Sequence, residues 1–228
     1  IVEFLGTWDE AIEKLERLVE MLSKKYNYLA NKLLFSTNGK SVQIASIAQE
    51  ISQKTSSFEK LTVLSCTKYD GLVESEKYFG RRVYGEDLSK YKSVPQGCFV
   101  YATNHIEEGS IGLQNQYELA LISPMYTVFK IDTRQVNPSF LFYLLKSPYY
   151  VKEYKRRTEG SIDRRGGLRW NSFAKIKIQL PEIERQVFIA TMLQNFEYEL
   201  KLLNKELAAL QKQKRGLMQK LLTGTWRV

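Results

Sequence analysis

The sequence predicts an α+β protein in which one mixed α+β domain lies between two long α-helices that pair as an antiparallel coiled coil. Apolar residues at both ends of the chain recur in alternating steps of four and three, the a/d pattern of helices that pack lengthwise. The two ends align when the chain is shifted by 188 positions. Between them, short β-type runs alternate with glycine-containing turns. The expected boundaries are 1–36, 37–180 and 181–228.

The first helix is expected to carry one narrow apolar stripe and to stop before Gly39. A helix of this length with a single stripe needs another helix to cover it. The residues expected at the helix–helix interface are Leu5, Trp8, Ile12, Leu15, Val19, Leu22, Leu29 and Leu33.

The second helix follows Pro181, keeps the same rhythm and stops at Gly224. Lys214 interrupts its apolar pattern at the position that aligns with Tyr26 in the first helix. Its expected interface residues are Ile189, Leu193, Phe196, Leu200, Leu203, Leu207, Leu210, Leu217 and Leu221.

The two helices share more than a period, because KRGLMQKLLTG at 214–224 aligns with YNYLANKLLFS at 26–36. In this alignment Leu29 falls on Leu217, and the double leucines coincide. An internal repeat accounts for the match, and chance similarity between two amphipathic helices is the alternative.

The middle segment predicts strands and one interrupted helix. β-Type residues indicate strands at 41–51, 62–66, 98–104 and 125–131, and the alternating run KIKIQL closes the domain with a strand over 173–180. Residues 138–154 read as a helix capped by Asn137 and broken at Pro148. Turn signals occur at Asp70-Gly71, Gly80, Pro95-Gln96-Gly97, Glu108-Gly109 and Gly112.

Composition limits the function classes. With 228 residues and 43% hydrophobic content the chain can bury a sizeable core. No apolar run reaches membrane-spanning length, and the start at Ile1 shows no secretory pattern, so we expect a cytoplasmic protein or a fragment of one. Cys66 and Cys98 lie far apart, which favours neither a disulfide framework nor a zinc site.

The positive charge is concentrated in one stretch. The net charge is +9, and residues 152–177 hold nine basic and three acidic side chains. A glycine-containing basic stretch suits a polyanion, because each neutralised phosphate releases counterions. A solvated surface loop is the alternative.

Motifs that resemble active sites are incomplete. Residues 137–140, NPSF, lack the second proline of the N-P-P-Y/F tetrapeptide of amino-methyltransferases, and no glycine-rich loop follows a strand. EYK at 153–155 matches the loose E-x-K of nucleases without an upstream Pro-Asp partner. His105 is the only histidine, which excludes a metal site built on several histidines. We therefore predict a non-enzymatic protein without cofactor or metal.

The C-terminal segment combines Leu180-Pro181, Gln186, Ile189-Ala190 and the closing nonapeptide Gly216–Gly224. With these residues it resembles the end of the specificity subunits of type I restriction–modification enzymes. SPMYTVF at 123–129 and the Pro-x-Phe-Leu at 138–141 are similar to parts of that family's recognition domains. Where the family often has Glu-Glu-Gln, this chain has Glu184-Arg185-Gln186.

The resemblance implies a DNA target-recognition domain between two conserved spacer helices, about half of the usual plan. Such a chain is a fragment, or a half-subunit that pairs with a second copy. The implied partners are double-stranded DNA and the methyltransferase and restriction subunits, and a fixed coiled coil would set the gap of a bipartite target. A coiled-coil scaffold with a protein-binding middle domain and a nucleic-acid-modifying enzyme are the alternatives.

Basic and polar residues near turn signals are the candidates for DNA contact, because arginine reads guanine and many cations hold phosphates. About half of them are expected to touch DNA, and surface solubility is the alternative for each. They are Lys68, Tyr69, Arg81, Arg82, Asn104, His105, Arg156, Arg157, Arg164, Arg165 and Arg169.

Overall fold

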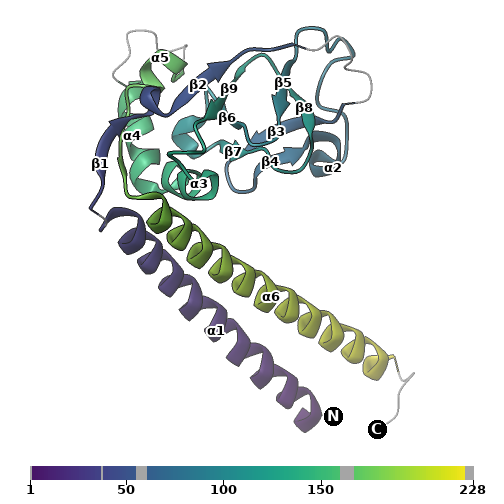
Figure 1. Cartoon of the computed structure of the whole chain (residues 1–228). Coiled ribbons are helices and arrows are strands. Elements are labelled where there is room, and N and C mark those ends of the chain that lie inside the picture. Colours follow the sequence, from purple (N-terminus) through teal and green to yellow (C-terminus); the bar gives the residue numbers. More distant parts are fainter. Residues whose placement is uncertain (1, 37, 55–60, 160–166, 224–228) are drawn as a thin grey trace. The chain divides into compact units, whose positions relative to one another are not determined.

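The computed structural model describes the chain except residues 1, 37, 55–60, 160–166 and 224–228 (Figure 1). The chain forms two compact units. The helical unit comprises residues 1–36 and 191–228, and the globular unit comprises residues 37–190. Their boundary at 190/191 lies within the last helix, ten residues beyond the position expected from the sequence. The α+β architecture predicted from the sequence is confirmed.

The helical unit is an antiparallel pair of α1 (Val2–Phe35) and α6 (Ile183–Leu222). The first turns of α6, up to residue 190, belong to the globular unit. Tyr26 near the end of α1 donates to Glu197 Oε1 at 2.7 Å, early in α6. Near the start of α1, Asp9 pairs with Lys214, late in α6. Since early residues of one helix meet late residues of the other, the helices run in opposite directions, as Figure 1 shows.

These two cross-helix contacts are equivalent under the internal repeat. A shift of 188 positions places Asp9 on Glu197 and Tyr26 on Lys214, so one pair maps onto the other. An antiparallel pair of similar helices has this approximate two-fold relation, and chance similarity would not be expected to reproduce it. Lys214, which interrupts the apolar pattern of the second helix, and Tyr26 at the aligned position of the first thus both bond across the pair.

The apolar stripe of each helix is its least exposed side. The predicted interface residues from Trp8 to Leu33 in α1 are half-buried, and most positions between them are exposed. In α6, Leu193 is buried, and the predicted positions from Phe196 to Leu221 are half-buried. Ile189, in the globular unit, is buried as well. The Leu5 side chain lies outside the described part of the chain.

The described residues of the globular unit form three small sheets. Strands β2 (Ala48–Ile51), β9 (Tyr126–Ile131), β6 (Phe99–Ala102) and β7 (Ile111–Leu113) form one antiparallel sheet in that order. Strands β4 (Gly71–Glu74), β3 (Val63–Thr67), β8 (Leu119–Ile122) and β5 (Lys92–Pro95) form another, in which β3 and β8 are parallel. Strands β1 (Lys40–Gln43) and β10 (Lys177–Leu180) form an antiparallel pair.

Short helices complete the unit: α2 (Ser75–Phe79), α3 (Pro138–Lys146), α4 (Pro148–Glu159), α5 (Trp170–Phe173) and the 3-10 turns η1 (Ile44–Ser46) and η2 (Ile106–Glu108). The predicted cap and break are confirmed. The side chain of Asn137 accepts from Phe140 N at 2.9 Å, and Ser147 separates α3 from α4.

Three local predictions were wrong. The strand expected over 173–180 begins only at Lys177, because Phe173 ends α5 inside the core. The segment expected as a strand over 41–51 is interrupted by η1. Gly112 is not in a turn but in β7, where the chain packs so closely that an added Cβ would lie 2.7 Å from Leu72 N.

An aromatic cluster forms much of the core. Phe99 stacks on Phe129 with ring centroids 5.1 Å apart, and Tyr101 stacks on Phe173 at 4.7 Å. Tyr154 of α4 is fully buried beside Phe173. Burial of such rings contributes about 2 kcal/mol or more each. The cluster thereby fixes β6, β9, α4 and α5, the elements that carry the turns described below.

Gln186 anchors the first turns of α6 within the globular unit. Its side chain has no exposed surface. Its Oε1 accepts from Asn137 N at 2.8 Å, and its Nε2 donates to Pro181 O at 2.8 Å and to Gln135 O at 3.0 Å. All three bonds satisfy backbone groups that folding removes from water, so Gln186 links the start of α6 to the loop before α3.

Among the described residues, no helix has both the length and the apolar character that a membrane span requires.

Candidate nucleic-acid interface

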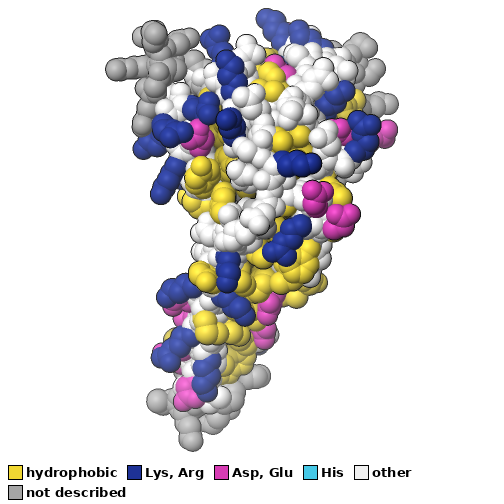
Figure 2. Space-filling model, turned by 60° about the vertical axis from the view of Figure 1, so that its left-hand side comes forward, with side chains coloured by type: hydrophobic (Ala, Val, Ile, Leu, Met, Phe, Trp, Pro, Cys, Tyr) yellow, Lys and Arg dark blue, Asp and Glu magenta, His cyan; other side chains and the backbone are white. Residues whose placement is uncertain are grey.

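Lys and Arg side chains are spread over the visible face of the globular unit in Figure 2, and Asp and Glu side chains are less prominent there. A positive surface of this kind favours a polyanionic partner. Only the local geometry can show which of the candidate residues share one surface.

Two segments far apart in sequence meet after β6. Leu168 N donates to Thr103 O at 2.9 Å, which joins the turn 103–105 to the segment 167–169. Gly167 has a φ of +60°, and a Cβ there would lie 2.2 Å from Thr103 O. Glycine is therefore needed both for the left-handed backbone and for the close approach. The contact brings Asn104, His105 and Arg169 to one place.

The turn 123–125 between β8 and β9 joins them. Thr103 Oγ1 donates to Met125 O at 2.9 Å, and Ala102 pairs with Tyr126 in the register of β6 and β9. We call the turns 103–105 and 123–125 and the segment 167–169 the loop corner. It contains a pocket of about 200 Å³ lined by Ala102, Thr103, Asn104, His105, Met125 and Tyr126.

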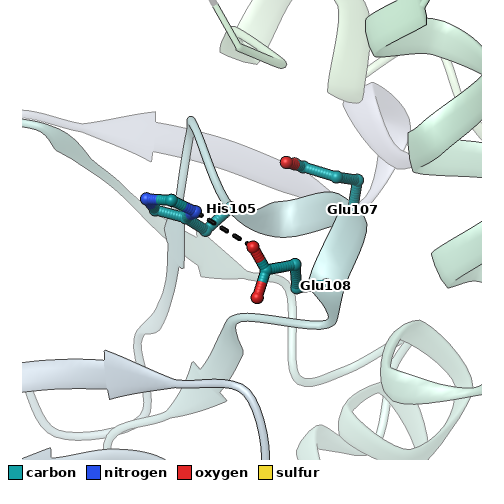
Figure 3. A group of neighbouring side chains, drawn as sticks. All are labelled: His105, Glu107 and Glu108. Atoms are coloured by element: carbon teal, nitrogen blue, oxygen red, sulfur yellow. Dashed lines mark hydrogen bonds and ion pairs between the residues drawn. The ribbon is translucent and has the colours of Figure 1, made fainter.

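Carboxylates border one side of the loop corner (Figure 3). His105 Nδ1 lies 3.3 Å from Glu108 Oε1, and the two side chains point toward each other. Donor atoms of His105, Glu107 and Glu108 lie within 4.8 Å of one another, a set that a divalent cation could use. Exposed acidic groups of this kind are common without a metal, and we assign no ion to them.

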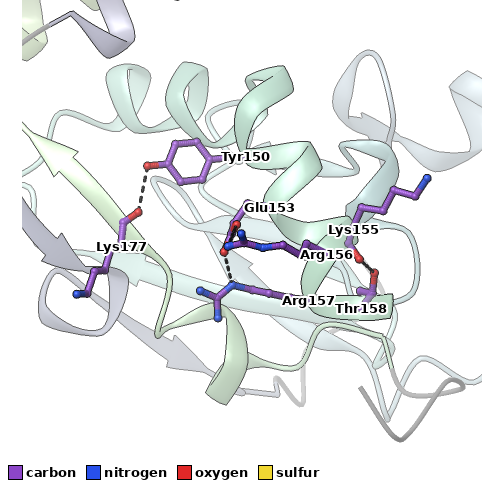
Figure 4. A network of polar contacts seen from close by, with 7 residues as sticks. All are labelled: Tyr150, Glu153, Lys155, Arg156, Arg157, Thr158 and Lys177. Atoms are coloured by element: carbon purple, nitrogen blue, oxygen red, sulfur yellow. Dashed lines mark hydrogen bonds and ion pairs between the residues drawn. The ribbon is translucent and has the colours of Figure 1, made fainter. Parts of the chain in front are cut away.

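Helix α4 packs against η2, which directly follows the turn 103–105, and carries Arg156 and Arg157 in its last turn. Glu153 accepts from Arg156 Nη2 at 2.5 Å and from Arg157 Nε at 2.7 Å (Figure 4). Burial raises the pKa of Glu153, but the two arginine hydrogen bonds outweigh it, and the pKa ends below its ordinary value. The Arg156 side chain is 77% exposed, so its guanidinium remains accessible beyond this ion pair.

The predicted second loop has a different character. Lys68 Nζ lies 5.2 Å from the centre of the Tyr69 ring. Arg82 lies 4.9 Å from the Tyr84 ring, and its Nη2 donates to Gly85 O at 3.1 Å. These cations are held by neighbouring groups, and the exposed Arg81 lies beside Arg82 in the sequence.

An open groove of about 450 Å³ lies close to this loop. It is lined by Asp70, Leu72, Val73, Glu74, Lys77, Tyr78, Gln116 and Tyr117. Tyr78 donates to Asp70 at 3.0 Å and Tyr117 donates to Glu74 at 3.1 Å. With two carboxylates and one ammonium, the groove does not favour phosphate.

The structure therefore brings some of the candidates together in one place. Asn104, His105 and Arg169 lie in the loop corner, and Arg156 and Arg157 lie on the adjacent α4. Lys68, Tyr69, Arg81 and Arg82 lie in the β3–β4 turn and after α2. Arg164 and Arg165 lie outside the described residues. Sequence reasoning missed Met125, whose 64% exposure is unusual for its type. Its place directly after Ser123-Pro124 was the available signal.

Comparison with known proteins identifies the family. The profile described as "Type I restriction modification DNA specificity domain" matches residues 76–212, which include the loop corner and α4. The chain belongs to this family. The family expected from the sequence is thereby confirmed, although the matched residues end before the closing nonapeptide Gly216–Gly224.

A curated relative is the "Type I restriction enzyme MjaVIII specificity subunit" of Methanocaldococcus jannaschii. It is 31% identical over 147 residues, which cover 62% of this chain and 34% of the relative. The chain thus spans about a third of the length of this specificity subunit.

Two solved structures have the same fold. One is the S subunit of a type I restriction–modification system from M. genitalium, with a TM-score of 0.59, 17% identity and coverage of 96% of this chain and 59% of that one. The other is the HsdS subunit from Thermoanaerobacter tengcongensis, with a TM-score of 0.63, 12% identity and coverage of 96% and 55%. At these identities the likeness concerns the fold alone.

Proposed function

We propose that this chain is the DNA-recognition component of a type I restriction–modification complex. In this proposal the globular unit binds one part of a bipartite target in double-stranded DNA, and the helical unit acts as the spacer between two such modules. The observation that carries the proposal is the loop corner, where the turn of Asn104 and His105 meets the segment of Arg169 and the turn of Met125, all within the residues that match a DNA specificity domain.

Some residues of this surface suit contacts to phosphates and others suit contacts to bases. Arg156 and Arg157 on α4, with Arg169, supply cations for phosphates, which position a protein on the duplex. Asn104 and His105 project from a turn bordered by carboxylates, so they suit base edges better than the backbone. Arg164 and Arg165 lie outside the described residues, and their proposed contact with DNA rests on their charge and their place in the basic stretch 152–177. Lys68, Tyr69, Arg81 and Arg82 are assigned to the outer part of the DNA-binding surface.

The chain would contribute recognition and no catalysis. The methyltransferase subunit would methylate adenine in the selected site and the restriction subunit would cleave, both directed by this component. The second copy of the recognition module would come from a longer chain or from pairing of two chains through their helices. The Leu217–Leu222 end is assigned to docking of the methyltransferase subunit, so deletion of 214–228 should prevent complex formation.

Selection of bound duplexes from a random pool tests the proposal. The full chain, alone and with the methyltransferase subunit, is incubated with random DNA, and the retained duplexes are sequenced. The proposal expects an enriched motif, in two parts at a fixed gap wherever two modules assemble. Retained DNA without any enriched motif would contradict it. The double variant Arg164→Ala with Arg165→Ala should weaken binding by about 1–3 kcal/mol if one of them reads a base pair.

A protein-binding middle domain is the second candidate. It is favoured by the acidic, tyrosine-lined groove near α2, whose charge suits a cationic segment better than a phosphate. A chain that retains no DNA at low salt but captures a protein through this groove would support that alternative.

A further inference from the structure

We propose that the pocket of the loop corner reads one A·T base pair in the major groove, with Asn104 contacting the adenine and Met125 contacting the thymine methyl group. This inference rests on the proposed function, because it names the base pair that one part of that surface selects.

Thymine is distinguished in the major groove by its C5-methyl group, and the paired adenine by N7 and its N6 amino group. A reader of this pair needs an apolar surface beside a side-chain amide. The loop corner has both. Met125 is 64% exposed on the turn before β9, and Asn104 is exposed on the turn after β6.

The backbone holds the two side chains at one site. Ala102 of β6 pairs with Tyr126 of β9. Asn104 follows Ala102 by two residues and Met125 directly precedes Tyr126, so the two residues lie at the same end of the strand pair. The bond from Thr103 Oγ1 to Met125 O, at 2.9 Å, closes the turns onto each other. Both turns line the same pocket of about 200 Å³, whose walls include Ala102 and Tyr126. An exposed methionine above such a pocket provides polarisable apolar surface.

The charges around the pocket favour a base edge over a phosphate. Glu108 holds His105 at 3.3 Å, and Glu107 Oε2 is shielded from solvent without a hydrogen-bond partner among the described residues. Oxygen atoms of both carboxylates lie within 4.8 Å of a His105 ring nitrogen, so they would repel a phosphate placed beside His105. Cations lie instead on the neighbouring segments, in Arg169 and in Arg156 of α4.

Replacing thymine by deoxyuridine tests the inference without altering the protein. The duplex selected by the full chain is made in a series in which each thymine in turn becomes deoxyuridine, which removes one methyl group. One position should show binding weakened about fourfold, the factor that corresponds to burial of one methylene-sized group. The other positions should show no change.

Variants then assign the contact. Met125→Ala should abolish the deoxyuridine effect at that position, and Met125→Gln, which keeps the length of the side chain, should do the same. Met21→Ala is the matched control, because Met21 is 59% exposed in the helical unit. Asn104→Ala should remove the preference for adenine opposite the sensitive thymine when the selection is repeated.

The outcomes separate the two proposals. A selected motif whose affinity is the same with thymine and deoxyuridine at every position would overturn this inference and leave the proposed function standing. A sensitive position that stays sensitive in both Met125 variants would also overturn it. Absence of sequence-selective binding would overturn the proposed function and this inference together.

Discussion

Gly167→Ala should separate the two segments that build the loop corner. An alanine at a φ of +60° carries the left-handed backbone cost of about 1–2 kcal/mol. Its Cβ would also lie 2.2 Å from Thr103 O, so the gap has to widen to the 3.4 Å of an ordinary contact. That movement breaks the bond from Leu168 N to Thr103 O, worth about 1 kcal/mol. Overpacking adds about 1–3 kcal/mol.

Gly80→Ala is the matched control. Gly80 has a φ of +66° and no atom within 4 Å of the Cβ position, so alanine there carries the backbone cost alone. Urea denaturation should show a free energy of unfolding lower by about 3–6 kcal/mol for Gly167→Ala and by about 1–2 kcal/mol for Gly80→Ala. The Leu168 amide should exchange with deuterium faster only in Gly167→Ala, and DNA binding should weaken only there, because Arg169 shifts.

Equal stability of the two variants, with unchanged exchange at Leu168, would refute the reasoning. It would mean that the segment 167–169 does not pack on the turn 103–105, and Arg169 would no longer share a surface with Asn104.

Three further predictions concern the two units. Leu203→Asp should lower the thermal midpoint strongly, because the lost burial costs several kcal/mol of stability. Leu202→Asp changes a neighbouring position that is 47% exposed, so it should change the midpoint little. Equal shifts in the two variants would refute the interface assignment. Gln186→Ala should lower the free energy of unfolding in urea by about 2–4 kcal/mol because it removes the three hydrogen bonds of a fully buried side chain, and a loss below about 0.5 kcal/mol would contradict that role. Burial raises the pKa of the Cys66 thiol from 9.0 to about 12. The unfolded thiol therefore loses its proton first, so stability should fall as pH rises from 9 toward 12, and native Cys66 at pH 9 should react with a thiol reagent far more slowly than the unfolded chain. Rapid labelling of the native thiol would contradict this burial.

Local and periodic features were predictable from the sequence. The a/d steps depend only on helix geometry. Lys214, which interrupts the apolar pattern of the second helix, bonds across the pair, as does Tyr26 at the aligned position. The cap at Asn137 and the break before Pro148 follow from local chemistry. Such features need no knowledge of which segments meet in space.

Features that depend on distant contacts were not predictable. Phe173 lies in an alternating run that predicts a strand. Its ring instead stacks on Tyr101 in the core, and the residue ends α5. Gly112 resembled a turn residue because the close approach of Leu72 cannot be seen in the local sequence.

The same holds for the candidate site. Thr103 and Leu168 are 65 positions apart, so charge and turn signals could nominate Asn104 and Arg169 separately but could not place them together. The charge pattern around Arg82 likewise did not predict that its guanidinium contacts the Tyr84 ring and the Gly85 carbonyl.

The most direct test of DNA recognition by this chain is a comparison of two duplexes over a salt series. The full chain is titrated by fluorescence anisotropy against the selected duplex and against a scrambled duplex of the same composition. We predict tighter binding to the selected duplex at every salt concentration, by a factor of about a thousand or more. We also predict a linear fall of log K with log salt for both duplexes, with a slope of about −0.9 for each phosphate neutralised. Equal affinity for the two duplexes, or binding that does not respond to salt, would contradict DNA recognition by this chain.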